Sequence, residues 1–152
     1  IMAELLSPEI KACIGQASPS IHVEVTRRDL RKYAVSTGQK AKKYLDGDVA
    51  PPLFHFGYAM EILPVDELRK DGIAEDKLIP ELPLKRLMAG SSDTVYHRPI
   101  CAGDKLVVTR KLKDLYEKEG RTGPLIFVVT EVVVETEAGE PVLNETTSLI
   151  AR

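Results

Sequence analysis

The side chains best suited to chemistry in this sequence are two aspartates and a histidine that lie close together along the chain. Asp46 and Asp48 precede a Pro51-Pro52 pair, and His55 follows it. A carboxylate and an imidazole in contact form an acid–base pair that can activate water or move a proton. The alternative is structural: the acids cap or solvate a loop, and His55 is a hydrogen-bonded residue of a helix. The residues themselves leave both interpretations open.

A short cluster of lysines lies just before these residues. Lys40, Lys42 and Lys43 could contact phosphate groups as point charges, or they could lie on a solvated loop. The net charge of the chain is −2 and no long basic face is evident, which gives no argument for a nucleic-acid partner. Cys13 and Cys101 lie far apart and the chain has three histidines, so the sequence predicts neither a metal site nor a disulfide framework.

Length and composition suit one globular domain. The chain has 152 residues, of which 43% are apolar and 29% are charged, and a chain of this size can bury a sizeable core. No run approaches the ~18 apolar residues that a membrane span needs, and no signal peptide is evident. Together with the two lone cysteines, these features predict a cytoplasmic protein with no membrane partner. Ile1 precedes Met2, so we regard it as an expression remnant and expect a single domain over 2–152.

The elements that must position these side chains follow from local patterns. Ser7 before a proline, and Thr26 with Asp29 three residues on, are typical helix starts. Alternating apolar residues near Val23 indicate a half-buried strand, and Gly38 is placed to end a helix. We therefore expect a helix to about residue 14, a strand over 21–25, a helix over 26–38, and a loop or broken turn over 39–49.

The segment 51–63 differs from the rest because it is apolar on nearly every side. A helix without a polar face is buried on most sides. Pro51 and Pro52 suit its first turn, where backbone N–H groups lack partners, and Pro64 marks its end. This segment is therefore predicted to be a central helix, followed by a short helical piece and an irregular connection over 65–90.

The last third of the chain has the pattern of a strand meander. Turn residues separate β-branched runs, and the Val-rich run over 125–136 should lie in the middle of the sheet. Expected strands cover 93–100, 105–115, 125–136 and 141–151. The predicted fold class is α+β, with a curved antiparallel sheet wrapped around the apolar helix.

Four strings, in order along nearly the whole chain, resemble the N-terminal, fatty-acid-synthase-like dehydratase domain of the MaoC-like family. They are Val25–Asp29, Val49–Phe54, Tyr96–Leu106 and Thr122–Val128. The resemblance implies the hot-dog fold, in which the helix is the sausage and the sheet the bun. It also implies a substrate that is an acyl thioester of coenzyme A or acyl carrier protein, no further cofactor, and two hot-dog units packed around an acyl tunnel.

Catalytic members of this family carry an Asp and a His just after the first long helix, in the order Gly-Asp, two residues, Pro, one residue, His. The Gly matches Gly38, but the Asp position falls on Gln39 and the His position on Tyr44. An amide does not titrate near neutral pH, and the unperturbed pKa of a tyrosine lies near 10. Lys42 stands at the position where the pattern has its Pro. The resemblance therefore implies the fold of the family without its catalytic pair.

Family members polarise the thioester carbonyl with backbone N–H groups at the start of the central helix, where the helix dipole helps. Pro51 and Pro52 have no N–H, so the donor must come from Val49, Ala50 or Leu53. Lysine and arginine side chains beside this path could contact the phosphates of coenzyme A. The expected substrate-binding residues are thus Val49, Ala50, Leu53, Phe54, Lys42 and Arg98.

Three functions remain open at this point. The first is a subunit of an (R)-specific 2-enoyl- or 3-hydroxyacyl-thioester hydratase that shapes the acyl tunnel while a MaoC-like partner supplies the Asp and His. The second is a self-sufficient homodimeric hydratase or thioesterase that uses Asp46, Asp48 and His55. The third is an acyl-thioester-binding module without chemistry.

Overall fold

The computed structural model describes residues 4–58 and 61–152. In this part of the chain, four helices and the first strand of the sheet come before a 3₁₀ turn, and the other four strands follow it. In chain order, the elements are α1 (Pro8–Lys11), β1 (Ile21–Glu24), α2 (Arg27–Ser36), α3 (Lys42–Leu45), α4 (Phe54–Tyr58), η1 (Val65–Glu67), β2 (Leu87–Tyr96), β3 (Lys105–Gly120), β4 (Gly123–Thr136) and β5 (Pro141–Ala151).

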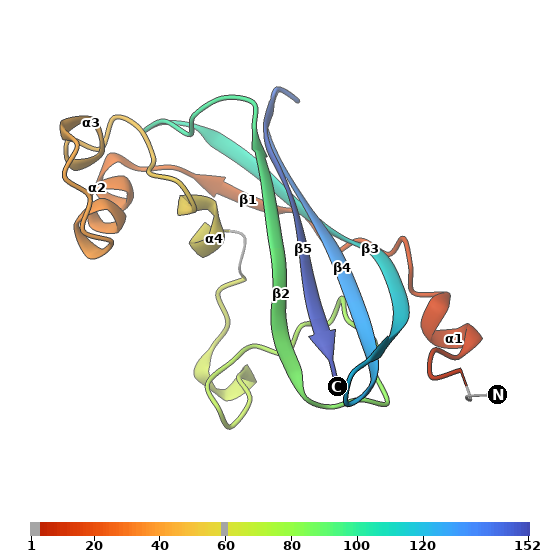
Figure 1. Ribbon diagram of the computed structural model, residues 1–152. Helices are drawn as coiled ribbons and strands as arrows, with labels where there is room; N and C mark the ends of the chain where they lie inside the picture. Colours follow the sequence, from red (N-terminus) through yellow and green to blue (C-terminus); the bar gives the residue numbers. More distant parts are fainter. Residues whose placement is uncertain (1–3, 59–60) are drawn as a thin grey trace.

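The five strands form one antiparallel sheet in the order β1-β3-β4-β5-β2. The sheet is long and curved, with β2 as a free edge strand (Figure 1). Alternate residues of β4 are buried from Ile126 to Val134, as expected of a strand that packs one face on the core. The prediction that this Val-rich run lies centrally is confirmed.

The two predicted helix starts are confirmed by their caps. The Ser7 hydroxyl accepts a hydrogen bond from the Ile10 N–H, and the Thr26 hydroxyl accepts one from the Asp29 N–H. These bonds satisfy donors that the first turn of a helix leaves without partners. The predicted end of the second helix is also confirmed, because Gly38 follows it with φ of +70°, a conformation that glycine adopts without strain.

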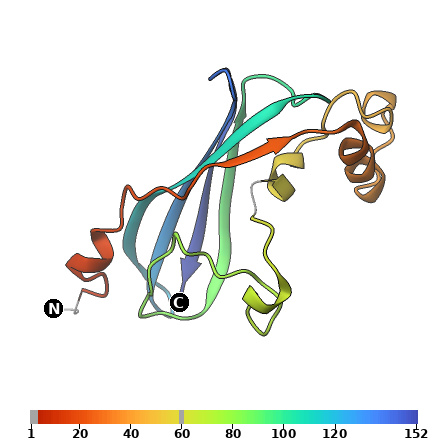
Figure 2. The ribbon, with the colours of Figure 1, turned by 180° about the vertical axis from the view of Figure 1, so that it is seen from behind.

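The buried side chains form two clusters. One lies under α2 and α4 and includes Leu30, Phe54 and Ile100, and the other includes Leu6 and Leu112. Figures 1 and 2 show α2 and α3 together beyond one end of the sheet, with α1 near the other end. The first cluster therefore joins the α2–α4 region to the sheet.

The predicted long helix over 51–63 is wrong in its extent. Leu53 has φ of +67°, which is outside the right-handed helical region, so α4 begins only at Phe54. Residues 59–60 lie outside the described part, and the chain from 61 to 64 is not helical. Phe56 and Ile62 are 62% and 98% exposed, so the expectation of a helix buried on most sides does not hold for the single chain.

Two smaller differences concern the connections and the first of the four predicted strands. The predicted loop over 39–49 contains the one-turn helix α3. Strand β2 begins at Leu87 rather than at residue 93, because its pairing with β5 extends to Ala151, and it therefore lies at the edge beside β5 and not next to β3 as in a simple meander. Within residues 4–58 and 61–152, no helix is long and apolar enough to span a membrane.

Candidate functional site

The segment that leads into α4 holds the backbone groups predicted to meet the substrate, and each of them already has an acceptor. The Ala50 N–H donates to the Ile100 carbonyl at 2.7 Å and the Val49 N–H to the Lys43 carbonyl at 3.4 Å. The Leu53 N–H donates to the Tyr96 hydroxyl at 3.1 Å. Leu53 and Tyr96 are 51% and 46% exposed, so the Leu53 N–H is the predicted donor that a ligand can reach most easily.

A buried acid–base pair connects α4 to the sheet. His55 Nε2 lies 3.2 Å from Glu145 Oε2, and the two side chains are only 2% and 4% exposed. Glu145 comes from β5, and its other oxygen accepts hydrogen bonds from Ser92 at 2.7 Å and Thr94 at 3.1 Å, both on β2. The His55 ring also contacts the Tyr96 ring edge-on, with centroids 6.1 Å apart.

The contact between His55 and Glu145 lacks the geometry of an aligned hydrogen bond. Within the described part of the chain, neither ring nitrogen of His55 has a hydrogen-bond partner. A carboxylate that is held by two hydroxyls and faces an imidazole can exchange a proton with it. In the single chain, however, both groups are closed to solvent, so the pair can hold α4 on the sheet but cannot meet a substrate directly.

Glu145 is the functional residue that sequence reasoning missed. Its signal is the alternation of β5, which places Glu145 on the same face as Leu143 and Ala151. A glutamate on the buried face of a strand needs a partner, and that partner lies 90 residues earlier in the sequence. The alternation of β5 is the signal from which a buried acid could have been predicted, but nothing local in the sequence identifies His55 as its partner.

The two aspartates that were considered as partners of His55 lie in a different network. Asp48 pairs with Arg27 Nη1 at 2.5 Å, and Asp46 pairs with Lys42. This pairing with Asp46 raises the pKa of Lys42, so Lys42 stays positively charged in solution. The structure therefore assembles His55 with Glu145 and keeps both aspartates beside α3.

The positions where the family carries its catalytic dyad lie on either side of the start of α3. The Gln39 N–H donates to the Ala34 carbonyl at 2.9 Å, just after α2. Tyr44 lies within α3, with Lys43 Nζ 5.0 Å from the centroid of its ring. Both side chains are half-buried. An amide and a phenol thus stand where the resemblance expects a carboxylate and an imidazole.

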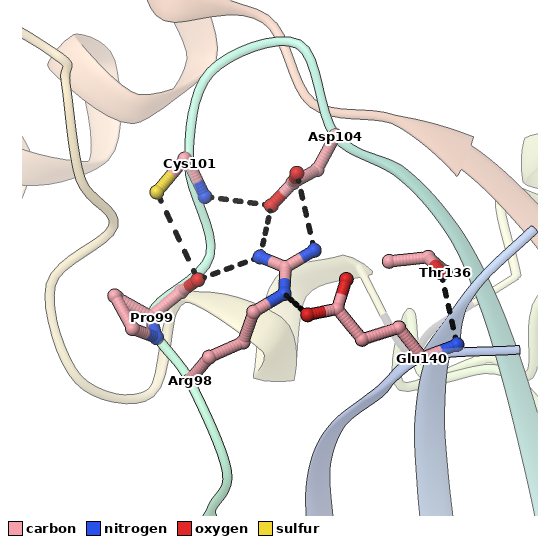
Figure 3. A network of polar contacts seen from close by, with 6 residues as sticks. All are labelled: Arg98, Pro99, Cys101, Asp104, Thr136 and Glu140. Atoms are coloured by element: carbon pink, nitrogen blue, oxygen red, sulfur yellow. Dashed lines mark hydrogen bonds and ion pairs between the residues drawn. The ribbon is translucent and has the colours of Figure 1, made fainter. Parts of the chain in front are cut away.

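Arg98, a predicted phosphate contact, is held in a network at the connection between β2 and β3 (Figure 3). Its guanidinium bonds both oxygens of Asp104, at 2.8 and 3.2 Å, and donates to the Pro99 carbonyl at 2.8 Å. Glu140 lies 3.3 Å from Nε. The hydrogen bonds that Arg98 donates to the Asp104 carboxylate raise the pKa of Arg98. A ligand phosphate would have to compete with two carboxylates here.

A small groove lies between α2 and α4, next to the expected substrate path. Its volume is about 300 Å³, and we call it the inner groove. The Tyr33 ring packs edge-on against Phe54, with centroids 5.5 Å apart, and the Tyr33 hydroxyl donates to the Pro52 carbonyl at 3.4 Å. The lining residues are Asp29, Lys32, Tyr33, Ser36, Phe54 and Gly57. Of the predicted substrate-binding residues, Phe54 is the one that lines it.

Comparisons with known proteins agree with this fold. A family model described as FAS1-like, dehydratase domain region, matches residues 12–145. A UPF0336 protein of Streptomyces avermitilis is 31% identical over 139 residues, which cover 88% of each chain. A mesaconyl-C(4)-CoA hydratase of Chloroflexus aurantiacus is 32% identical over 79 residues, or 51% of this chain and 28% of that protein.

Solved structures share the fold at lower identity. The HadBC (3R-hydroxyacyl-ACP dehydratase) complex of Mycobacterium tuberculosis gives a TM-score of 0.66 at 20% identity, covering 91% of this chain and 97% of that one. A MaoC-like dehydratase gives a TM-score of 0.72 at 19% identity, covering 93% of this chain and 43% of that one. The α+β hot-dog fold predicted from the sequence is thus confirmed, and the chain belongs to the FAS1-like dehydratase region family of MaoC-like hot-dog hydratases and dehydratases.

Proposed function

We propose that this chain is the dyad-lacking subunit of an (R)-specific 2-enoyl- or 3-hydroxyacyl-thioester hydratase. The proposal is supported by Gln39 and Tyr44 at the positions where the resemblance expects the catalytic Asp and His, and by the closure of the His55–Glu145 pair to solvent. Hydration requires a base that takes a proton from water as the water oxygen bonds to the β-carbon, and a proton delivered to the α-carbon. In this proposal both proton transfers belong to the Asp and His of a partner subunit.

The surface around β2 supports a partner. This strand is exposed along nearly its whole length and is bonded on one side only, to β5. A free edge strand is a ready template for pairing with another chain. Nearby apolar side chains that lack cover in the single chain are Leu53, Phe56, Leu87, Met88, Val95 and Tyr96. The HadBC structure is itself a complex of dehydratase chains.

In this assembly the present chain shapes the acyl tunnel and binds the thioester. The Leu53 N–H, once released from Tyr96, is the best placed of its backbone donors for the thioester carbonyl. Such a donor stabilises the negative charge that develops on the oxygen during addition. The substrate is an acyl thioester of coenzyme A or acyl carrier protein, and the location is the cytoplasm.

The test compares the isolated chain with a reconstituted pair. The purified chain is assayed for hydration of crotonyl-CoA and of longer enoyl-CoA substrates, alone and after mixing with a hot-dog subunit from the same organism that carries an intact dyad. We expect no turnover from the chain alone and turnover from the pair. A partner with its Asp changed to Asn is the control and should abolish the activity. Robust turnover by the chain alone, retained through repurification, contradicts the proposal.

The His55–Glu145 pair favours a second candidate, a self-sufficient homodimeric hydratase or thioesterase. In this alternative, movement of α4 opens the pair to substrate. Because Glu145→Gln keeps the shape of the side chain but cannot take up a proton, it should abolish activity in such an enzyme. An active wild type whose activity survives Glu145→Gln and His55→Gln excludes this candidate. Tight binding of acyl thioesters, with no turnover alone or with the partner, would indicate a binding module instead.

A further inference from the structure

A second groove, larger and positively charged, runs along one face of α2. Its volume is about 720 Å³, which is within the usual range of small-molecule pockets. The described residues that line it are Arg27, Arg28, Arg31, Lys32, Val35 and Ser36. Four of these six residues are cationic. We call this surface the cationic groove.

The charges of this region are concentrated well beyond the average of the chain. Residues 27–48 contain seven lysines and arginines and three aspartates, in a chain whose net charge is −2. Arg27 and Arg28 stand in the first turn of α2, where the helix dipole disfavours cations. Like charges also face each other four residues apart, Arg27 with Arg31 and Arg28 with Lys32. An anion bound in the groove would reverse both unfavourable effects.

Two of the four cations are held in place by α3 and the residue after it. Arg27 Nη1 donates to the Asp46 carbonyl at 2.8 Å in addition to its ion pair with Asp48. Arg31 Nε donates to the Leu45 carbonyl at 3.2 Å. These contacts satisfy carbonyls at the C-terminal end of α3. They also fix the positions of two guanidinium groups along the groove.

Close packing of the backbone at Gly47 restricts the positions of the Arg27 and Arg31 side chains. A Cβ atom at Gly47 would lie 2.7 Å from both the Arg27 carbonyl oxygen and Arg31 Cγ. The chain therefore packs directly on the stems of the two arginines, at a residue with φ of +75°. A larger residue could not occupy this position without moving them. The fixed half of the groove is thus part of the fold.

The other two cations are available for a ligand. Arg28 and Lys32 are exposed, and the ion pairs found among the described residues include neither of them. Of the four cations that the sequence suggested as phosphate contacts, Lys42 and Arg98 are paired with carboxylates. Lys40 and Lys43 occur in none of the ion pairs among the described residues, but they do not line the groove. Arg28 and Lys32 are therefore the unpaired cations of the cationic groove.

The cationic groove adjoins the inner groove, because Lys32 and Ser36 line both. A ligand with an anionic head in the first can therefore extend past these residues toward Phe54 and the start of α4. We propose that the cationic groove binds the phosphates of a coenzyme A thioester, whose pantetheine arm then passes along the inner groove. This inference rests on the proposed function for the identity of the substrate and deepens it by naming the carrier.

The dimensions of the groove favour coenzyme A over an acyl carrier protein. A protein partner typically buries about 800 Å² on each side of a specific interface, whereas this surface is one face of a ten-residue helix. A phosphate, by contrast, needs only a few converging cations. Arg28 and Lys32 supply exposed charges that no described carboxylate neutralises, and Arg31 supplies a charge that its bond to the Leu45 carbonyl fixes in position. Arg27 is already paired with Asp48.

The test measures binding by isothermal titration with the full chain, alone and in complex with its dyad-bearing partner. The probes are coenzyme A, 3′-dephospho-coenzyme A and pantetheine. The double variant Arg28→Gln/Lys32→Gln should weaken coenzyme A binding by about tenfold or more and leave pantetheine binding unchanged. The matched control Lys77→Gln/Arg121→Gln removes two exposed charges outside the groove and should have little effect.

Three outcomes overturn the inference. They are an equal loss in both double variants, an unchanged affinity in the groove variant, and no binding of coenzyme A by either the chain or the complex. A defect seen only with carrier-protein thioesters also overturns it and assigns the surface to that carrier. In the assembled enzyme, the groove variant should raise KM for enoyl-CoA but not for an enoyl-pantetheine, with kcat retained.

These readouts separate the inference from the proposed function. If the pair hydrates both substrates and the groove variant changes neither KM, the proposed function stands and the groove assignment fails. If coenzyme A binding depends on Arg28 and Lys32 but the pair hydrates no thioester, the groove assignment stands and the proposed function fails.

Discussion

The buried pair beneath α4 and the cationic groove on α2 are two charged regions that differ in what their charges do. His55 and Glu145 are closed to water, and Glu145 has two hydroxyl donors from the neighbouring strand. Arg28 and Lys32 are open to solvent and lie four residues apart on α2, and Arg28 also stands in the first turn, where the helix dipole disfavours a cation. The first region stabilises the fold once it is assembled, whereas the second weakens α2 slightly unless an anion is present.

In this protein, burial distinguishes the ionisable groups that stabilise the fold from those that can bind a ligand. A buried charge that loses its partner becomes very costly, so it constrains the fold strongly. An exposed charge contributes little to stability because water screens it, and it remains available to a ligand. Each of the following predictions tests one side of this contrast.

The largest effect is expected at Glu145. The change Glu145→Ala leaves His55 and two hydroxyls facing a cavity, and it should lower the free energy of unfolding by about 3–5 kcal/mol. Urea denaturation measures the loss. Glu135→Ala, at an exposed position of β4, is the control and should cost far less. A loss at Glu145 no larger than at Glu135 would show that the pair does not hold α4 on the sheet.

The next effect concerns the backbone that fixes the arginines. Gly47→Ala should cost about 2–4 kcal/mol, because it adds a steric clash to the strain of a positive φ. Gly38 has a similar φ of +70° but nothing within 4 Å of an added Cβ, so Gly38→Ala should cost only about 1–2 kcal/mol. Thermal unfolding of both variants gives the comparison. Equal losses would mean that the packing on Arg27 and Arg31 is not tight.

A smaller effect is expected where the site meets solvent. Tyr96→Phe removes the acceptor of the Leu53 N–H, and the loss should be about 0.5–1 kcal/mol, since water can replace the hydroxyl at a half-exposed position. Tyr116→Phe on β3 is a suitable control because its ring stacks on Phe127 and would keep that contact. Chemical denaturation of the two variants compares them. A loss above about 2 kcal/mol would indicate that Leu53 is less accessible than its exposure suggests.

The smallest effect has the opposite sign. Arg28→Gln/Lys32→Gln should raise the stability of the unliganded chain by a few tenths of a kcal/mol, because it removes a like-charge pair four residues apart and a cation from the first turn of α2. The gain should shrink as salt is added, which a denaturation series at two ionic strengths would measure. A loss of stability would show that these side chains have structural partners and would weaken the contrast between the two regions.

Local sequence signals predicted much of the scaffold. Ser7 and Thr26 start helices because their hydroxyls accept hydrogen bonds from N–H groups that have no partner in the first turn. These bonds involve only residues that are close in the sequence. The Val-rich run of β4 identified the central strand because β-branched residues favour strands, and a nearly continuous run of them is typical of a strand within the sheet. The expectation that the family's dyad is absent rests on the residue types at Gln39 and Tyr44 alone, which do not depend on the fold.

Other features depended on contacts between distant parts of the chain. The sequence determined that His55 lies beside a proline pair and that Glu145 lies on an apolar strand face, but only the pairing of β2 with β5 under α4 brought the two together. It also determined which residues are cationic. Which cations are free was decided by the tertiary structure, because α3 accepts bonds from Arg27 and Arg31 while Asp46 and Asp104 neutralise Lys42 and Arg98. Charge is a property of a residue, whereas its availability depends on every neighbour that folding brings within a few ångströms.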